Sequence, residues 1–255
     1  MDEQALAGYL RRIGVTRPPA ADEAALRELH QAHLLAVPFE NLSIHLAEPI
    51  SLAPADLLDK IVVRGRGGFC YELNGAFALL LEALGAQVRR VAARVHSQDG
   101  LGPPFDHLAL VVGLPDGSGP WLADVGFGSH STYPLRLASG PGQPDPGGLF
   151  RLAAAGGTDL DVLKDGEPQY RIELRERALA DFEPTCWWQQ TSPDSHFTRS
   201  TICSRLTADG RISISGHTLI RTSGGARDEQ LLASDEVLAA YHEHFGISLD
   251  RVPGG

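Results

Sequence analysis

Residues 70–96 read CYELNGAFALLLEALGAQVRRVAARVH, and they decide the fold class because the hydrophobic period changes within them. Up to Leu84 the apolar side chains recur at helical spacing, and Gly85 is suited to end a helix. After residue 86 the period changes to that of a strand, which we expect over residues 87–96. The chain therefore passes from helix to strand near residue 86, which predicts an α+β protein.

The segments on either side of residue 86 extend this pattern. Before it we expect helices around residues 6–13, 22–33 and 54–61, and after it strands at 107–113 and 121–125, a loop at 140–148, hairpins at 161–174 and 201–215, and a closing helix at 229–245. Strands and helices do not alternate along the chain, so a parallel doubly wound sheet is not expected.

Composition and charge exclude several classes of protein. The 255 residues carry a net charge of −10, whereas nucleic-acid binders usually present a basic face. No apolar run approaches the roughly 20 residues that span a bilayer, and the first residues do not resemble a signal peptide. Three cysteines without a CxxC motif indicate neither a disulfide framework nor a zinc site. We expect a cytoplasmic protein that binds no nucleic acid, membrane or metal, and the oligomeric state is not predicted.

Cys70 has the sequence context of a nucleophile. It follows Gly67, Gly68 and an aromatic residue, and it begins the predicted helix. The dipole and free N–H groups of a helix start favour a thiolate, and the glycines allow a substrate to approach the backbone. The structural alternative is a small buried hydrophobic side chain.

His107 and Asp124 are the matching base and its orienting carboxylate. His107 begins a strand whose Ala109 and Val111 share its face, and Asp124 stands near the end of the next strand between apolar neighbours. Consecutive strands usually pair, so the two side chains are expected to meet, as in a Cys-His-Asp triad. The alternatives are a structural histidine and an aspartate that caps the following turn.

Other residues with chemical potential are given structural roles. The motif His242-Glu243-His244 lacks the helical i, i+4 spacing of a zinc site, and His30 and His33 are no stronger as metal ligands. Cys186 and Cys203 are expected in the core. Core packing is also the favoured role of Trp187 and Trp188, with the lining of a ligand cleft as the alternative.

Five motifs resemble the arylamine N-acetyltransferases. They are VPFENL at residues 37–42, RGGFCYELN at 66–74, DHLAL at 106–110, ADVGFG at 123–128 and SPDSHFTR at 192–199, in the family's order and spacing. The resemblance implies a helical bundle over residues 1–85, a central antiparallel β-barrel over 86–190 and an α/β lid over 191–255, with a cysteine-protease-like Cys-His-Asp core. The shortened tail after Leu249 departs from the family pattern and bears on the acyl-CoA cleft.

The resemblance also implies residue roles. Cys70 takes acetyl from acetyl-CoA, a co-substrate and not a resident cofactor, with His107 as base and Asp124 orienting it. A small aromatic amine or hydrazine then attacks the thioester in a ping-pong reaction. The implied acceptor contacts are Phe39, Phe127 and Phe197; the implied CoA contacts are Gly126 and Gly128; and Arg66 with Glu40 is an implied structural ion pair.

Other functions remain open from the sequence. The same triad can form an amide by releasing a polyketide as a macrolactam, as amide synthases of this superfamily do, or it can hydrolyse an amide without CoA. A non-catalytic arylamine-binding module is the alternative from a different class. All three triad positions are occupied, so nothing in the sequence argues for lost activity.

Overall fold

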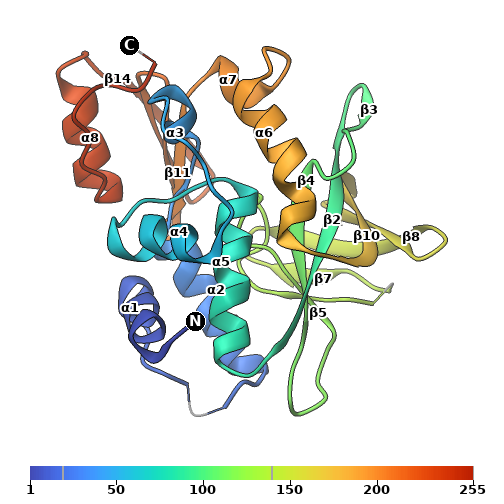
Figure 1. The fold of residues 1–255 in the computed structure, drawn as a ribbon. Helices are drawn as coiled ribbons and strands as arrows, with labels where there is room; N and C mark the ends of the chain where they lie inside the picture. The colour runs from blue at the N-terminus through green and yellow to red at the C-terminus, as the bar shows by residue number, and fades with distance from the viewer. Residues whose placement is uncertain (19, 139, 255) are drawn as a thin grey trace.

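The structure, a computed structural model, describes residues 1–18, 20–138 and 140–254 and has an α+β fold (Figure 1). N-terminal helices pack against a near-closed antiparallel β-barrel, and an α/β region follows at the C-terminal end. Helix α5 (Cys70–Ala83) lies between the other helices and the barrel (Figure 1). Within the described residues, each helix is too short or too polar to cross a bilayer.

The N-terminal helices begin and end at the residues that the sequence indicates. The side chains of Asp2 and Asp22 accept hydrogen bonds from first-turn N–H groups, and Gly14 ends the first helix in the left-handed conformation at φ 73°. Besides α5, the elements are α1 (Glu3–Ile13), α2 (Glu23–Ala36), α3 (Leu42–His45), α4 (Pro54–Leu58) and a π-helical turn (Asp59–Val63).

Helix α5 is buried on nearly all sides. Its apolar residues recur at helical spacing, but the polar residues Glu72 and Asn74 are also inside the protein. A helix covered all round is a central packing element, and its buried polar residues require internal partners. The chemistry of the site depends on those partners.

The barrel is an antiparallel sheet in the order β6-β5-β4-β2-β10-β9-β8-β7, with β3 paired to β2. Its strands are β2 (Gln87–Ser97), β3 (Gly100–Leu101), β4 (His107–Gly113), β5 (Trp121–Ala123), β6 (Leu135–Arg136), β7 (Gln143–Asp145), β8 (Gly148–Gly156), β9 (Asp159–Lys164) and β10 (Glu167–Arg177). In β4, Leu108 and Leu110 join the core shared with α5, whereas Ala109 and Val111 join the barrel core. The two-residue period places His107 on the barrel side, as predicted.

The C-terminal region contains a second antiparallel sheet, in the order β1-β11-β12-β13-β14. Its strands are β1 (Phe39–Glu40), β11 (Ile202–Leu206), β12 (Gly210–Ser215), β13 (Thr218–Ser223) and β14 (Ala226–Leu231). The helical elements in this part of the chain are a 3-10 turn (Leu179–Phe182), α6 (Glu183–Thr191), α7 (His196–Arg199) and α8 (Glu236–Phe245). Because β1 pairs with β11, residues from the two ends of the chain share one sheet. The three-domain division at residues 85 and 190 stays a prediction.

Two sequence expectations were wrong, and both concern sheet edges. The predicted loop at 140–148 contains β7 and the start of β8, and the predicted closing helix at 229–245 begins as strand β14 and turns helical at Glu236. β7 is an edge strand, where Pro144 costs no central hydrogen bond. β14 is an exposed, highly charged edge strand, which has no apolar alternation to reveal it.

A close backbone approach fixes the loop before α5. A Cβ built on Gly67 would lie 1.9 Å from the carbonyl oxygen of Pro38, and the N–H of Glu40 donates to the carbonyl of Gly68 at 2.8 Å. The VPFENL and RGGFCYELN motifs are therefore in direct backbone contact, and a side chain at position 67 would separate them.

We expect Gly67→Ala to lower the free energy of unfolding by about 1–3 kcal/mol, the usual cost of forcing extra atoms into a packed site. Urea unfolding followed by circular dichroism measures the change. Gly140→Ala is the matched control, because a Cβ there meets no atom within 4 Å. Equal stability of the two variants would contradict the proposed close approach.

Candidate active site

A cavity of about 590 Å³ opens beside the start of α5. Cys70, His107 and Gly126 line it together with residues of α6, α7 and the segments near them. The two sequence-predicted reactive groups, a thiol and an imidazole, therefore face the same space. Phe39, Phe127 and Phe197 line it as well.

The thiol of Cys70 stands at the first position of α5 and is buried. Burial raises the pKa of the Cys70 thiol, the backbone N–H of Leu108 opposes this, and the carboxylates of Asp106 and Asp124 add to the rise. Burial therefore opposes the effect that the start of a helix has on the pKa of the Cys70 thiol.

His107 is bound to Asp124 in the geometry of a catalytic dyad. The Nε2 atom of His107 lies 2.7 Å from Oδ2 of Asp124, and both side chains are buried. The carboxylate accepts, so Nε2 carries the hydrogen and Nδ1 is left as the basic nitrogen. His107 and Cys70 line the same cavity.

The Asp124 carboxylate is held as an anion. Burial alone would raise the pKa of Asp124. The charge of His107 and its hydrogen bond lower that pKa by more, and His130 and Asn74 lower it as well, so the net pKa is well below the ordinary range. Its Oδ1 atom accepts from Asn74 Nδ2 at 2.8 Å and from the N–H of Gly126 at 3.0 Å. Both carboxylate oxygens are thus paired.

Asn74 bonds to the Asp124 carboxylate, and the sequence did not single it out. Its Nδ2 also donates to the carbonyl of Leu108 at 2.7 Å, and its Oδ1 accepts from the N–H of Val125 at 2.9 Å. Asn74 lies one turn after Cys70 on α5, so a single side chain ties the nucleophile's helix to Asp124. The available signal was a polar residue at i+4 from the cysteine on a largely apolar helix.

The predicted aromatic residues meet at the cavity. The ring centroids of Phe39 and Phe197 are 6.1 Å apart, and Phe127 meets the ring of His107 edge-on at 5.2 Å. These distances are typical of aromatic pairs. The cavity therefore has aromatic side chains in its walls beside the Cys70 thiol.

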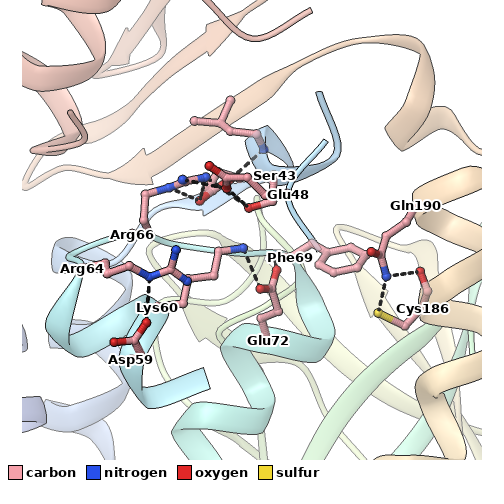
Figure 2. A network of polar contacts seen from close by, with 12 residues as sticks. Ser43, Glu48, Asp59, Lys60, Arg64, Arg66, Phe69, Glu72, Cys186 and Gln190 are labelled. Carbon is pink, nitrogen blue, oxygen red and sulfur yellow. Dashed lines mark hydrogen bonds and ion pairs between the residues drawn. The ribbon is translucent and has the colours of Figure 1, made fainter. Parts of the chain in front are cut away.

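Arg66 and Glu40 form the predicted ion pair behind the nucleophile's loop. Arg66 donates to Glu40 Oε1 at 3.0 Å and to Glu48 Oε2 at 3.2 Å (Figure 2 shows the Glu48 contact). Burial raises the pKa of Glu40, but the charges of Lys60 and Arg66 lower it to a net value below the ordinary one. The pair joins the segment of Phe39 to the segment of Gly67.

A second buried ion pair, Lys60 with Glu72, supports the start of α5 (Figure 2). Lys60 Nζ lies 2.6 Å from Glu72 Oε1, and Glu72 Oε2 accepts from the N–H of Phe69 at 3.3 Å. Burial raises the pKa of Glu72, and the charge of Lys60 opposes this. Glu72 therefore satisfies a backbone N–H one residue before Cys70, a contact that the sequence analysis missed.

The two predicted CoA-contacting glycines are placed differently. Gly126 lines the cavity, and a Cβ there would lie 2.8 Å from Cα of Cys70 and 2.7 Å from Asn74 Nδ2. Gly128 is outside the described lining; it has φ 92°, and its carbonyl accepts from Arg211 at 2.7 Å. Gly126 is thus required by its close contact with the nucleophile's helix, whatever else it binds.

The expectation that both tryptophans pack in the core was wrong. Trp188 lines the cavity and Trp187 is 66% exposed, whereas Cys186 and Cys203 are buried as expected. The face of α6 that carries Cys186 packs inward, so Trp188 lies at the cavity and Trp187 lies at the surface. In the described part of the chain, no three His, Cys, Asp or Glu side chains are grouped to hold a metal ion.

Comparisons with known proteins agree with this geometry. Residues 22–252 match the family described as N-acetyltransferase. The arylamine N-acetyltransferase of Mycolicibacterium smegmatis is 35% identical over 98% of this chain and 94% of that protein. A solved structure of the M. smegmatis enzyme superposes with a TM-score of 0.89, 36% identity and coverage of 98% and 93%. The solved structure of the Mycobacterium marinum arylamine N-acetyltransferase in complex with CoA superposes with a TM-score of 0.87 and 34% identity, and the match covers 95% of this chain and 92% of that chain.

The Lys60–Glu72 pair generates a stability prediction. We expect Lys60→Met to lower the free energy of unfolding by about 3–5 kcal/mol, because it leaves a buried carboxylate without its cation. The double variant Lys60→Met with Glu72→Leu is expected to be more stable than the single one, because the uncompensated charge is gone. Urea unfolding measures both.

The exposed pair of Arg17 with Glu3 supplies the control. Arg17→Met should change stability by less than about 1 kcal/mol, as is usual for surface ion pairs. If the double variant loses as much free energy of unfolding as Lys60→Met and Glu72→Leu lose together when measured singly, Lys60 and Glu72 are not coupled.

Proposed function

This chain belongs to the arylamine N-acetyltransferase family, and from that membership we propose a ping-pong acetyl transfer from acetyl-CoA to an aromatic amine or hydrazine through Cys70. The observation that carries the proposal is the buried 2.7 Å hydrogen bond from His107 to Asp124 beside a thiol in an aromatic-walled cavity. A neutral imidazole fixed in this way has one free basic nitrogen, and a buried thiol needs such a base.

In the first half-reaction, His107 Nδ1 takes the proton of Cys70. The sulfur then attacks the carbonyl carbon of the acetyl thioester, the bond from that carbon to the CoA sulfur breaks, and CoA leaves with the proton from His107. Asp124 stabilises the imidazolium that forms in between, because its paired carboxylate stays ionised. The product is an acetyl group on Cys70.

In the second half-reaction, the acceptor nitrogen attacks the thioester on Cys70. The carbon–sulfur bond breaks, the acetyl group becomes an amide, and the proton lost by the nitrogen returns through His107 to the thiol. The walls formed by Phe39, Phe127 and Phe197 suit a flat aromatic acceptor. This step resets the site without any resident cofactor.

For CoA we propose entry past Gly126, which lines the cavity, with Gly128 in the same turn. The M. marinum relative has been solved with CoA, and that likeness supports CoA as the leaving group here. Only the uncharged pantetheine arm of CoA has to enter the cavity, so the phosphates of the CoA nucleotide can stay outside it. A cytoplasmic location is part of the proposal, because Cys186, Cys203 and the nucleophile are all free thiols.

Intact-protein mass spectrometry after brief incubation with acetyl-CoA and no acceptor tests the proposed function. We expect one acetyl increment that requires Cys70 and disappears when an arylamine is added. Cys70→Ser is the control and should take up no acetyl group. An unlabelled wild-type protein would favour another acyl donor, and so the amide-synthase or hydrolase alternatives; an acetyl group elsewhere would exclude Cys70 as nucleophile.

The charge of the cavity predicts which acceptors react best. Asp106 and Asp194 line it, and its described lining contains no lysine or arginine. A carboxylate brought into such a space would be desolvated without a cation to pair with. We therefore expect 4-aminobenzamide to exceed 4-aminobenzoate by about 10-fold or more in kcat/KM, equivalent to about 1.4 kcal/mol.

Steady-state kinetics at saturating acetyl-CoA measure this ratio. Asp194→Asn should narrow it, because that change removes one of the two negative charges of the lining. Equal kcat/KM values for the two acceptors in the wild-type protein would show that the acceptor does not pass this acidic wall.

A further inference from the structure

His30, on α2, is buried and contacts the triad from outside the cavity. Its Nδ1 atom lies 2.9 Å from the carbonyl oxygen of Thr132, and its Nε2 atom accepts from the backbone N–H of Asp124 at 3.1 Å. The proposed mechanism uses neither ring nitrogen.

The two partners define the protonation state of His30. A backbone carbonyl can only accept and a backbone N–H can only donate, so Nδ1 carries the hydrogen and Nε2 does not. Burial lowers the pKa of His30, against the attraction of the Asp124 and Asp145 carboxylates, which agrees with a neutral ring. His30 is thus a rigid link with one donor and one acceptor.

The link acts on the backbone of Asp124. This residue follows β5, which ends at Ala123, and its N–H donates to His30. Its carboxylate is held by Asn74 and Gly126 and binds His107. Without His30, the main chain that carries the carboxylate would lose its anchor to α2.

We propose that His30 is a positioning residue for the Cys70-His107-Asp124 triad, acting through the backbone N–H of Asp124. The inference rests on the proposed function. The role of His30 is to hold the Asp124 carboxylate in the position from which that carboxylate keeps His107 oriented and basic. Displacing that carboxylate weakens His107 as a base, so the thiol of Cys70 reacts more slowly and at higher pH. Residues that orient metal-bound histidines typically contribute about 10- to 100-fold, and we expect a similar effect for an orienting contact to this triad.

Two substitutions separate the two hydrogen bonds of His30. In His30→Asn the amide nitrogen matches Nδ1 and keeps the bond to Thr132, but the side chain is too short to reach the N–H of Asp124. In His30→Gln the amide oxygen reaches the position of Nε2 and accepts from Asp124. We expect His30→Asn to lower the rate of Cys70 modification about 10- to 100-fold, and His30→Gln to keep most of the wild-type rate.

His33 provides the matched control. It lies on the same helix, is equally buried, and bonds to Tyr9 through Nδ1 at 3.1 Å rather than to the triad. His33→Asn should therefore reduce thermal stability about as much as His30→Asn and leave the reactivity of Cys70 unchanged. This comparison separates positioning from a general loss of packing.

The measurement is the pH profile of Cys70 alkylation by iodoacetamide, followed by mass spectrometry. It needs neither acetyl-CoA nor an acceptor, so it reports on His30 even if the acyl donor is a different one. We expect the midpoint for His30→Asn to rise by about one pH unit, the counterpart of a 10-fold loss. A wild-type profile in His30→Asn, or an equal change in His33→Asn, would overturn the proposal.

Two further results bear on the same point. If His30→Gln reacts no faster than His30→Asn, the bond to Asp124 is not the one that matters, and the proposal is wrong. If the variants fail to fold, NMR of the ring nitrogens in the wild-type protein decides instead. We expect a protonated Nδ1 and an unprotonated Nε2 at neutral pH, and a protonated Nε2 would exclude the contact with Asp124.

Discussion

Burial of the Asp124 carboxylate is the constraint on which the rest of the site depends. An unpaired charge inside a protein is expensive, so every hydrogen-bonding position around it must be filled. His107 and Asn74 fill two of these positions and the N–H of Gly126 fills a third. These donors come from β4, from α5 and from the turn after β5. One anion therefore dictates how three elements meet, and the reactive histidine is one of its required partners.

The same logic applies on the other side of the nucleophile. Arg66 and Lys60 flank the loop that leads into α5, and each is neutralised by a buried glutamate, Glu40 or Glu72. Glu72 also accepts from the N–H of Phe69, so one pair reaches the backbone beside Cys70 (Figure 2). Buried ion pairs add little net stability compared with apolar packing, but breaking one is costly. Their loss should therefore destabilise the loop that leads into α5.

The sequence predicted the elements better than their polar contacts. Hydrophobic period and capping residues located α1, α2, α5 and the hairpins, because burial of an apolar face is a local property of the sequence. The loop assigned to residues 140–148 and the helical start of 229–245 failed, because edge strands lack that signal. Motif context singled out Cys70, His107 and Asp124, and the structure places Cys70 and His107 at one cavity, with His107 bonded to Asp124. Motif context missed Asn74 and His30, because a pattern shows that a polar residue is buried without showing which distant group satisfies it.

The location of the triad between two layers has a consequence for how the protein works. Cys70 belongs to a helix, whereas His107 and Asp124 belong to the barrel, and the two meet where α5 packs on Leu108 and Leu110 of β4. Apolar contact of this kind supplies stability but tolerates small shifts, whereas proton transfer from a thiol requires hydrogen-bond distances. Directional bonds that cross the interface, above all those of Asn74, convert approximate packing into a fixed alignment. Because these bonds also pair the buried Asp124 carboxylate, a change in them should lower both the rate of reaction and the stability of the fold.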